Sequence, residues 1–167
     1  GLFSDNSLTD KEVNQIIERG ENAVRMLEML AELEVSLIVQ QLSNGDCDPV
    51  VNIDLKANQN NERYQHLLSK LYFEGVCIQQ DDNHGITWLT RSAEGGRVEA
   101  QIELAQRYYH GKGTPRDLAK ALQWIRQSAK QGDGTSQNLL GQLYESGEGV
   151  VQDFDKAREW YEQAAEN

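Results

Sequence analysis

Aromatic residues recur at a fixed step along this chain, and that step constrains the fold more than any other feature. The three tryptophans, Trp88, Trp124 and Trp160, are each 36 residues apart. Other residues keep the same step, namely Tyr72, Tyr108 and Tyr144; Gly75, Gly111 and Gly147; Asp81, Asp117 and Asp153; Ala93, Ala129 and Ala165; and Leu68, Leu104 and Leu140. Self-similarity at a period of this length is the signature of repeat architectures. We therefore expect stacked copies of one supersecondary unit.

The middle repeat predicts the internal structure of each copy. Leu104 and Tyr108 are four residues apart, which places them on one face of a helix. Gly111 can take the left-handed conformation that ends a helix. Asp117 can accept hydrogen bonds from the free N–H groups that begin the next helix. We therefore expect two helices in each repeat, a helix A over about 99–110 in this copy and a helix B after Asp117.

The expected fold class is all-α. No segment alternates apolar and polar residues as a half-buried strand does. A single helical hairpin buries only one face, so hairpins must stack to form a continuous core. We expect three such hairpins over residues 61–167. Their repeating Tyr and Trp side chains are interpreted as core residues, not as the walls of a ligand site.

The repeat pattern resembles a known family. Each copy follows Leu-x-x-x-Tyr-x-x-Gly, then Asp, then Ala-x-x-Trp-x-x-x-Ala-Ala, and the clearest copy contains Leu140, Tyr144, Gly147, Gly149, Val150, Asp153, Lys156, Ala157, Trp160, Ala164 and Ala165. This pattern is similar to that of the Sel1-like repeats, relatives of the tetratricopeptide repeats. The resemblance implies a right-handed superhelical solenoid of helix pairs that acts as an adaptor or partner-binding scaffold. The first repeat departs from the pattern at Cys77, which replaces a loop glycine, and at Gly85, which replaces the alanine of helix B.

A partial repeat is expected over residues 46–60. Asp48-Pro49 is typical of a helix start, and the 36-residue step makes 49–59 an unpaired helix B stacked antiparallel to the first helix A. Cys47 and Cys77 then lie at the same end of this pair, so we predict that they form a disulfide. A disulfide is typical of oxidising compartments. This favours the bacterial periplasm or cell envelope over the cytoplasm.

A narrower resemblance concerns the same region. Cys47, Val50, Ile53 and Ala57, followed by Gly75-Val76-Cys77, are similar to residues in Sel1-repeat proteins of sodium-driven flagellar motors. That resemblance implies a periplasmic position beside the stator. A flagellar motor component is therefore one alternative function, and an immunity protein that neutralises a secreted effector or toxin is another.

The N-terminal part has a different composition. We expect residues 1–8 to be disordered and residues 9–45 to form a helical extension, because Thr9 and Glu12 make a capping box. An amphipathic stretch follows over residues 21–42. It is interpreted either as a cap on the first repeat or as a helix that docks a partner or forms a homodimer through residues 21–43.

Charge and composition exclude several function classes. The net charge of −11 repels phosphate backbones, so we expect no nucleic-acid partner. No apolar run reaches the ~20 residues of a membrane helix, so no direct membrane span is expected.

His66, His84 and His110 share no metal-ligand spacing and are interpreted as surface residues. We expect no metal, no cofactor and no catalytic residues.

The expected partner is a protein or peptide bound on the concave face. In stacked hairpins helix A lines that face, and the helical positions turned away from the core define the candidate partner-binding residues. These are Arg63, His66, Lys70 and Phe73 in the first repeat; Glu99, Ile102, Gln106 and Tyr109 in the second; and Thr135, Asn138, Gln142 and Glu145 in the third. Phe73, Ile102 and Tyr109 have no core role in this register, which favours a binding role. The alternative is that they pack against the 21–43 helix.

Overall fold

The structure is a computed structural model that describes residues 31–166. These residues fall into two compact units whose boundary lies between Asn44 and Gly45. The described part of the first unit is a helix over residues 31–43. The expectations for residues 1–8, for the capping box at Thr9 and for the start of the amphipathic stretch lie outside the described residues.

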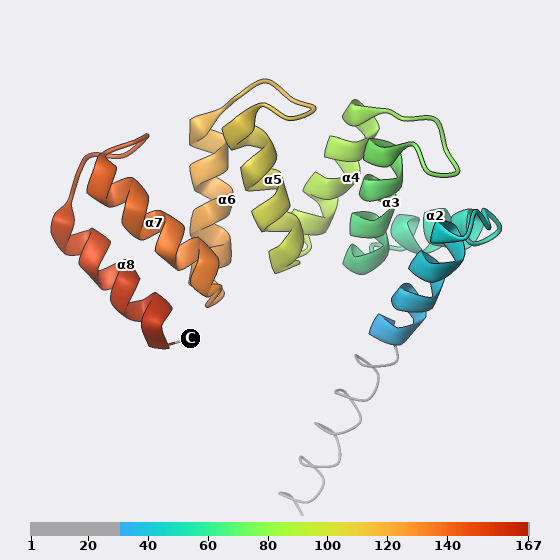
Figure 1. Ribbon diagram of the computed structural model, residues 1–167, viewed down its shortest axis with the longest axis horizontal. Helices are drawn as coiled ribbons and strands as arrows, with labels where there is room; N and C mark the ends of the chain where they lie inside the picture. The colour runs from blue at the N-terminus through green and yellow to red at the C-terminus, as the bar shows by residue number, and fades with distance from the viewer. Residues whose placement is uncertain (1–30, 167) are drawn as a thin grey trace, which may run out of the picture. The chain divides into compact units, whose positions relative to one another are not determined.

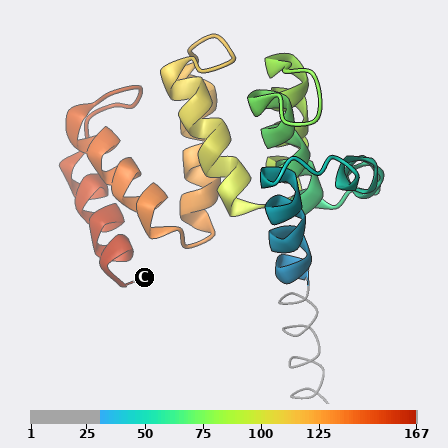
Figure 2. The same ribbon diagram turned by 45° about the vertical axis from the view of Figure 1, so that its right-hand side comes forward.

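The second compact unit consists of consecutive helices. They are α2 (Pro49–Asn58), α3 (Glu62–Glu74), α4 (Asp82–Glu94), α5 (Val98–His110), α6 (Leu118–Lys130), α7 (Gly134–Ser146) and α8 (Phe154–Glu166). Each of these helices packs against the next one in the chain, and the hairpins α3–α4, α5–α6 and α7–α8 follow one another in both views (Figures 1 and 2). Residues 31–166 contain no β-strand. The expected all-α fold is confirmed. In the structure α2 precedes the three hairpins.

The same capping residues build each hairpin. Asp81, Asp117 and Asp153 each accept a backbone hydrogen bond of 3.0 Å from the residue three positions later. Helix A ends in all three repeats at a glycine with a left-handed φ of 69° to 76°. At α2 the helix begins at Pro49 as expected, but the Asp48 side chain does not cap it. Instead the Asp48 N–H donates to the side chain of Asp46.

The core follows the leucine and tryptophan positions of the repeat. Leu68, Leu104 and Leu140 are fully buried, and Trp88 and Trp124 are buried. The repeating tyrosines differ from expectation, because all three are only half-buried. In the second and third repeats a lysine ammonium, Lys120 or Lys156, lies over the tyrosine ring at 5.1 or 5.6 Å. The lysine ammonium stays near water because it is charged. The tyrosine ring that it covers therefore lies at the edge of the core.

A repeating glutamine joins successive hairpins. Gln65, Gln101 and Gln137 are buried and keep the 36-residue step. The side-chain N–H of each donates to the backbone carbonyl of an alanine near the end of the preceding helix B, at 3.0 to 3.2 Å. A carbonyl at a helix end has no partner inside its own helix. Each of these three carbonyls also accepts a hydrogen bond from a backbone N–H of the following turn, that of Asn60, Gly96 or Gly132. The glutamine therefore adds a second hydrogen bond, which joins the end of helix B to the next helix A.

Cys47 and Cys77 are joined by a disulfide. Their Cα atoms are 5.4 Å apart, a usual separation for a disulfide. The bond joins the segment before α2 to the loop after α3. Cys77 has a φ of 62°, close to the φ of 71° and 73° at Gly113 and Gly149, which occupy the equivalent loop positions. The cysteine thus adopts a left-handed conformation that glycine adopts in the other repeats.

Candidate binding groove

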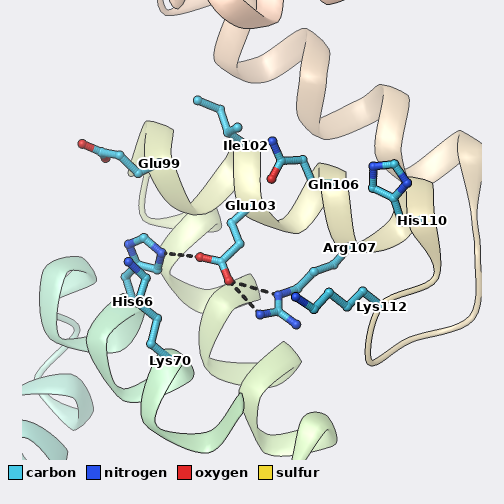
Figure 3. Close-up of a pocket in the computed structure, with 9 residues that line it drawn as sticks. All are labelled: His66, Lys70, Glu99, Ile102, Glu103, Gln106, Arg107, His110 and Lys112. Atoms are coloured by element: carbon cyan, nitrogen blue, oxygen red, sulfur yellow. Dashed lines mark hydrogen bonds and ion pairs between the residues drawn. The ribbon is translucent and has the colours of Figure 1, made fainter. Parts of the chain in front are cut away.

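A pocket of about 590 Å³ lies beside α3 and α5 (Figure 3). It is lined by residues of these two helices and of the loop after α5, namely His66, Lys70, Glu99, Ile102, Glu103, Gln106, Arg107, His110 and Lys112. Most of these side chains are charged or polar. The pocket is therefore suited to binding a polar or ionised group.

A second pocket of about 210 Å³ adjoins the first. It is lined by Ile102, Ala105, Gln106, Tyr109, His110, Ile125, Thr135, Ser136 and Leu139. Ile102, Gln106 and His110 line both pockets, because they are spaced four residues apart and form one stripe along α5. The two pockets together are called the helix-A groove below, since helices A of all three repeats contribute to it.

The side chains of His66, Glu103 and Arg107 form a hydrogen-bonded network in the first pocket. His66 Nε2 lies 2.9 Å from Glu103 Oε2, and Arg107 donates from Nε and Nη2 to Glu103 Oε1 at 3.0 and 2.9 Å. Arg97 Nε donates to His66 Nδ1 at 3.4 Å. Because Nδ1 accepts that bond, the ring hydrogen is on Nε2, which donates to Glu103. His66, Glu103 and Arg107 are called the triad below, and Figure 3 shows its contacts.

The interpretation of His66 as a surface residue is wrong. The residue is 7% exposed. A buried imidazole is tolerated when both ring nitrogens have partners, and Glu103 and Arg97 supply them. His66 still lines the groove, as the candidate set expected.

The triad arises where the second repeat departs from its neighbours. At the positions of Glu103 and Arg107 the first and third repeats carry leucines, which are Leu67, Leu71, Leu139 and Leu143. The substitution places a carboxylate and a guanidinium four residues apart on the groove side of α5, where they form a partly buried ion pair. Neither residue is predicted by the repeat pattern, because that pattern contains only what the repeats share. The sequence feature that could have revealed them is a pair of charged residues at two positions where the other repeats carry leucine.

The triad holds the Glu103 carboxyl in its ionised form. Burial alone raises the pKa of this carboxyl. The hydrogen bonds from His66 and Arg107, together with the electrostatic attraction to these side chains, outweigh burial and lower the pKa of the Glu103 carboxyl from 4.5 to about 2. Glu103 is therefore an anion throughout the physiological pH range, with its two oxygens already engaged.

The lowered pKa predicts acid-dependent stability. The folded state binds the Glu103 proton more weakly than the unfolded chain, so its stabilisation is complete above about pH 4.5 and is lost as the pH falls towards 2. We expect the free energy of unfolding to fall by up to about 3 kcal/mol over this range because of Glu103. In Glu103→Gln this part of the decrease should be absent. Urea unfolding of both proteins between pH 6 and 2 tests the prediction, which is wrong if the two stability curves run parallel.

The structure places seven of the twelve candidate residues in the groove. They are His66, Lys70, Glu99, Ile102, Gln106, Tyr109 and Thr135. Asn138 and Gln142 are exposed but line neither pocket. Glu145 accepts a hydrogen bond from the Tyr161 hydroxyl at 2.8 Å and lines a different hollow beside α8. Arg63, at the start of α3, is half-buried and lies outside the groove.

Phe73 corrects the expectation that this residue has no core role. It is 9% exposed and belongs to the main hydrophobic cluster. A Cβ at Gly85 would lie 2.4 Å from the Phe73 ring, so the missing alanine of helix B creates the space for the ring. The Arg107 guanidinium covers the ring at 3.2 Å. Tyr109, at the same repeat position, is half-buried and donates from its hydroxyl to Glu148 at 2.9 Å.

Comparison with known proteins identifies the repeat. The sequence model of the Sel1 repeat matches residues 63–96, 98–133 and 134–167. The chain belongs to the Sel1 repeat family. Proteins of this family are generally non-enzymatic and bind other proteins.

Solved structures of Sel1 repeat proteins have the same fold. A Sel1 repeat protein from Oxalobacter formigenes is 35% identical, with a TM-score of 0.66 over 70% of this chain and 88% of that one. The protein c5321, a protective antigen of uropathogenic Escherichia coli strains with an SLR fold, is 28% identical with a TM-score of 0.68. That match covers 96% of this chain but only 33% of c5321. No curated protein matches the chain. Among the described helices none is long and apolar enough to cross a membrane.

Proposed function

We propose that this Sel1 repeat chain is a non-enzymatic adaptor that binds a segment of a partner protein in the helix-A groove. The observation that carries the proposal is the stripe of Ile102, Gln106 and His110, which lines two adjoining pockets of different chemistry. A segment lying across this stripe can place neighbouring side chains in both pockets. Binding across several stacked hairpins is how solenoid proteins use their extended surfaces.

The size of the apolar pocket and the charged lining of the larger pocket favour a protein segment over a small molecule. Pockets for drug-sized ligands have volumes of ~300–1,000 Å³ and are mostly apolar. The apolar pocket has a volume of only about 210 Å³, which suits a single anchoring side chain. The larger pocket is dominated by charged groups. An anchor in a small pocket, bordered by polar contacts, is the usual arrangement of a protein-binding hot spot.

The chemistry of the groove gives little support to catalysis. A general base works best with a pKa near the operating pH, whereas the pKa of Glu103 is about 2. Both Glu103 oxygens are also engaged by His66 and Arg107. Glu103 is therefore interpreted as a fixed part of the groove wall that orients His66 and Arg107.

The proposed location is the periplasm or cell envelope of a bacterium. The Cys47–Cys77 disulfide supports this location, because structural disulfides persist in oxidising compartments and are rare in the cytosol. The two Sel1 structures compared above also come from bacterial proteins.

Site-specific photo-crosslinking in the native cell tests the proposed groove. A photoreactive amino acid at Gln106, in the shared wall of both pockets, is expected to form a covalent adduct with the partner. The same amino acid at Arg126, which is exposed on α6 and lines neither pocket, is the matched control and is expected to give no adduct. Adducts at both positions, or at Arg126 alone, would place the partner elsewhere.

Two further readouts make this experiment specific. Adding Ile102→Asp puts a charge in the wall of the apolar pocket and should abolish the Gln106 adduct. The mass of the adduct separates two kinds of partner. A species of twice the mass of the chain without an adduct would mean that a second copy occupies the groove, and would contradict the proposal of a different partner protein.

A further inference from the structure

The first pocket of the helix-A groove carries the opposite charge from the chain as a whole. The chain has 27 acidic and 16 basic residues. The pocket has more bases than acids, namely Lys70, Arg107 and Lys112 against Glu99 and Glu103. A positive region on an acidic protein concentrates the attraction for anionic groups at one place.

The two lysines provide the available positive charge. Glu103 is bonded within the triad, and Glu99 lies 3.5 Å from Arg97. Lys70 and Lys112 make no ion pair with any residue in the described part of the chain, and both are exposed. Lys70 extends from α3 and Lys112 from the loop after α5, and both border the pocket (Figure 3). An anion in this pocket can therefore contact either ammonium group without breaking an existing pair.

The apolar pocket lies on the other side of the shared stripe. Ile125 and Leu139 form part of its wall, together with Ile102 of the stripe. A side chain bound there is removed from water by aliphatic groups of α5, α6 and α7. The groove thus offers positive charge and an apolar cavity on opposite sides of one row of α5 side chains.

We propose that the partner segment carries an acidic side chain next to a large apolar one. The Asp or Glu carboxylate binds at Lys70 and Lys112, and the apolar side chain fills the pocket lined by Ile125 and Leu139. This inference rests on the proposed function, and it specifies the chemistry of the partner. A basic segment is disfavoured because both acids of the pocket are already paired and the two lysines would repel it.

Selection from a phage-displayed library of random dodecapeptides on the full chain tests this chemistry. Selected peptides are expected to be enriched in Asp or Glu within a few positions of Leu, Ile or Phe. Binding of the strongest selected peptide is then measured by fluorescence anisotropy. Lys70→Glu and Lys112→Glu are each expected to weaken it roughly five- to tenfold, because each replaces an attraction by a repulsion. Lys130→Glu, an exposed charge reversal at the end of α6 and outside both pockets, should change it less than about twofold.

Other outcomes separate failure of this inference from failure of the proposed function. In one outcome, the selected peptides fail to bind the Ile102→Asp variant but bind all three lysine variants with equal affinity. That result would overturn the proposal of an acidic partner segment but not the proposal that the partner binds in the groove. Peptides that are insensitive to Ile102→Asp, or a selection that yields none, would overturn both. Enrichment of Lys and Arg in the selected peptides would also overturn the charge assignment.

Two other occupants of the groove are tested with the same peptide. A synthetic peptide of residues 1–30 of this chain should not displace it, and displacement would show that the chain's own segment occupies the groove. Sedimentation velocity should show the same oligomeric state with and without the peptide. Dissociation of a dimer on peptide binding would show that a second copy occupies the groove.

Discussion

Replacing Trp124 by alanine is expected to lower the free energy of unfolding by about 3–5 kcal/mol. Trp124 is only 7% exposed and lies in the main hydrophobic cluster, on helix α6, which packs against both α5 and α7. Its removal loses a large buried apolar area and leaves a cavity that the surrounding helices cannot fill by small movements. Urea unfolding monitored by circular dichroism at 222 nm measures the loss.

Trp160 provides a matched control for this substitution. It occupies the same repeat position on α8, but it is only half-buried. Among the described helices α8 packs against α7, whereas α6 packs against both α5 and α7. Trp160→Ala should therefore cost clearly less than Trp124→Ala. Equal losses would mean that the tryptophan acts within its own hairpin and not between hairpins.

The helical hairpins could be predicted because their boundaries depend on local chemistry. Gly111 ends a helix through its own left-handed φ of 70°, and Asp117 caps the next helix through a bond to a residue three positions away. Both effects act over a few residues, so they can be recognised wherever the same residues recur. The 36-residue step then repeats the local prediction three times.

The groove was predicted only in part, because its chemistry depends on differences between the repeats. Glu103 and Arg107 replace leucines, and the repeat pattern gives no reason to expect a charged pair there. His66 is held by Arg97, which is 31 residues away in the sequence. The spacing of residues within one helix does not predict a contact of this kind. The positions on helix A were therefore identified more reliably than the contacts between the side chains.

Phe73 shows the same limit for the core. Its repeat equivalent Tyr109 lines the groove, so the repeat step alone assigns both residues to the same surface. The space for the Phe73 ring is created by Gly85, on a different helix. Gly85 was recognised as a departure from the pattern, but the ring that takes the place of its missing Cβ could be identified only from the packing of α3 against α4. The repeating glutamines were overlooked for a related reason, because glutamine is usually exposed.

Removing the Cys47–Cys77 disulfide is expected to cost roughly 3.5 kcal/mol of stability. The bond joins residues 30 apart in the sequence, and a loop of this size restricts the unfolded chain by about that free energy in the entropy model. Under non-reducing conditions, mass spectrometry should show a linked peptide containing both cysteines, two hydrogens lighter than the reduced pair. The free energy of unfolding of the Cys47→Ser/Cys77→Ser double variant, compared with that of the oxidised chain, measures the cost.

The left-handed conformation of Cys77 separates two contributions to that cost. A non-glycine residue at a φ of 62° is disfavoured by about 1–2 kcal/mol relative to a right-handed conformation. Serine at this position keeps that penalty, whereas glycine removes it. Cys47→Ser/Cys77→Gly also lacks the disulfide, but its loop has the residue that the other two repeats carry. We therefore expect it to be about 1 kcal/mol more stable than the double-serine variant. If the two variants are equally stable, the loop of the first repeat relaxes once the bond is removed, and the left-handed Cys77 is maintained by the disulfide and not by the Sel1 loop.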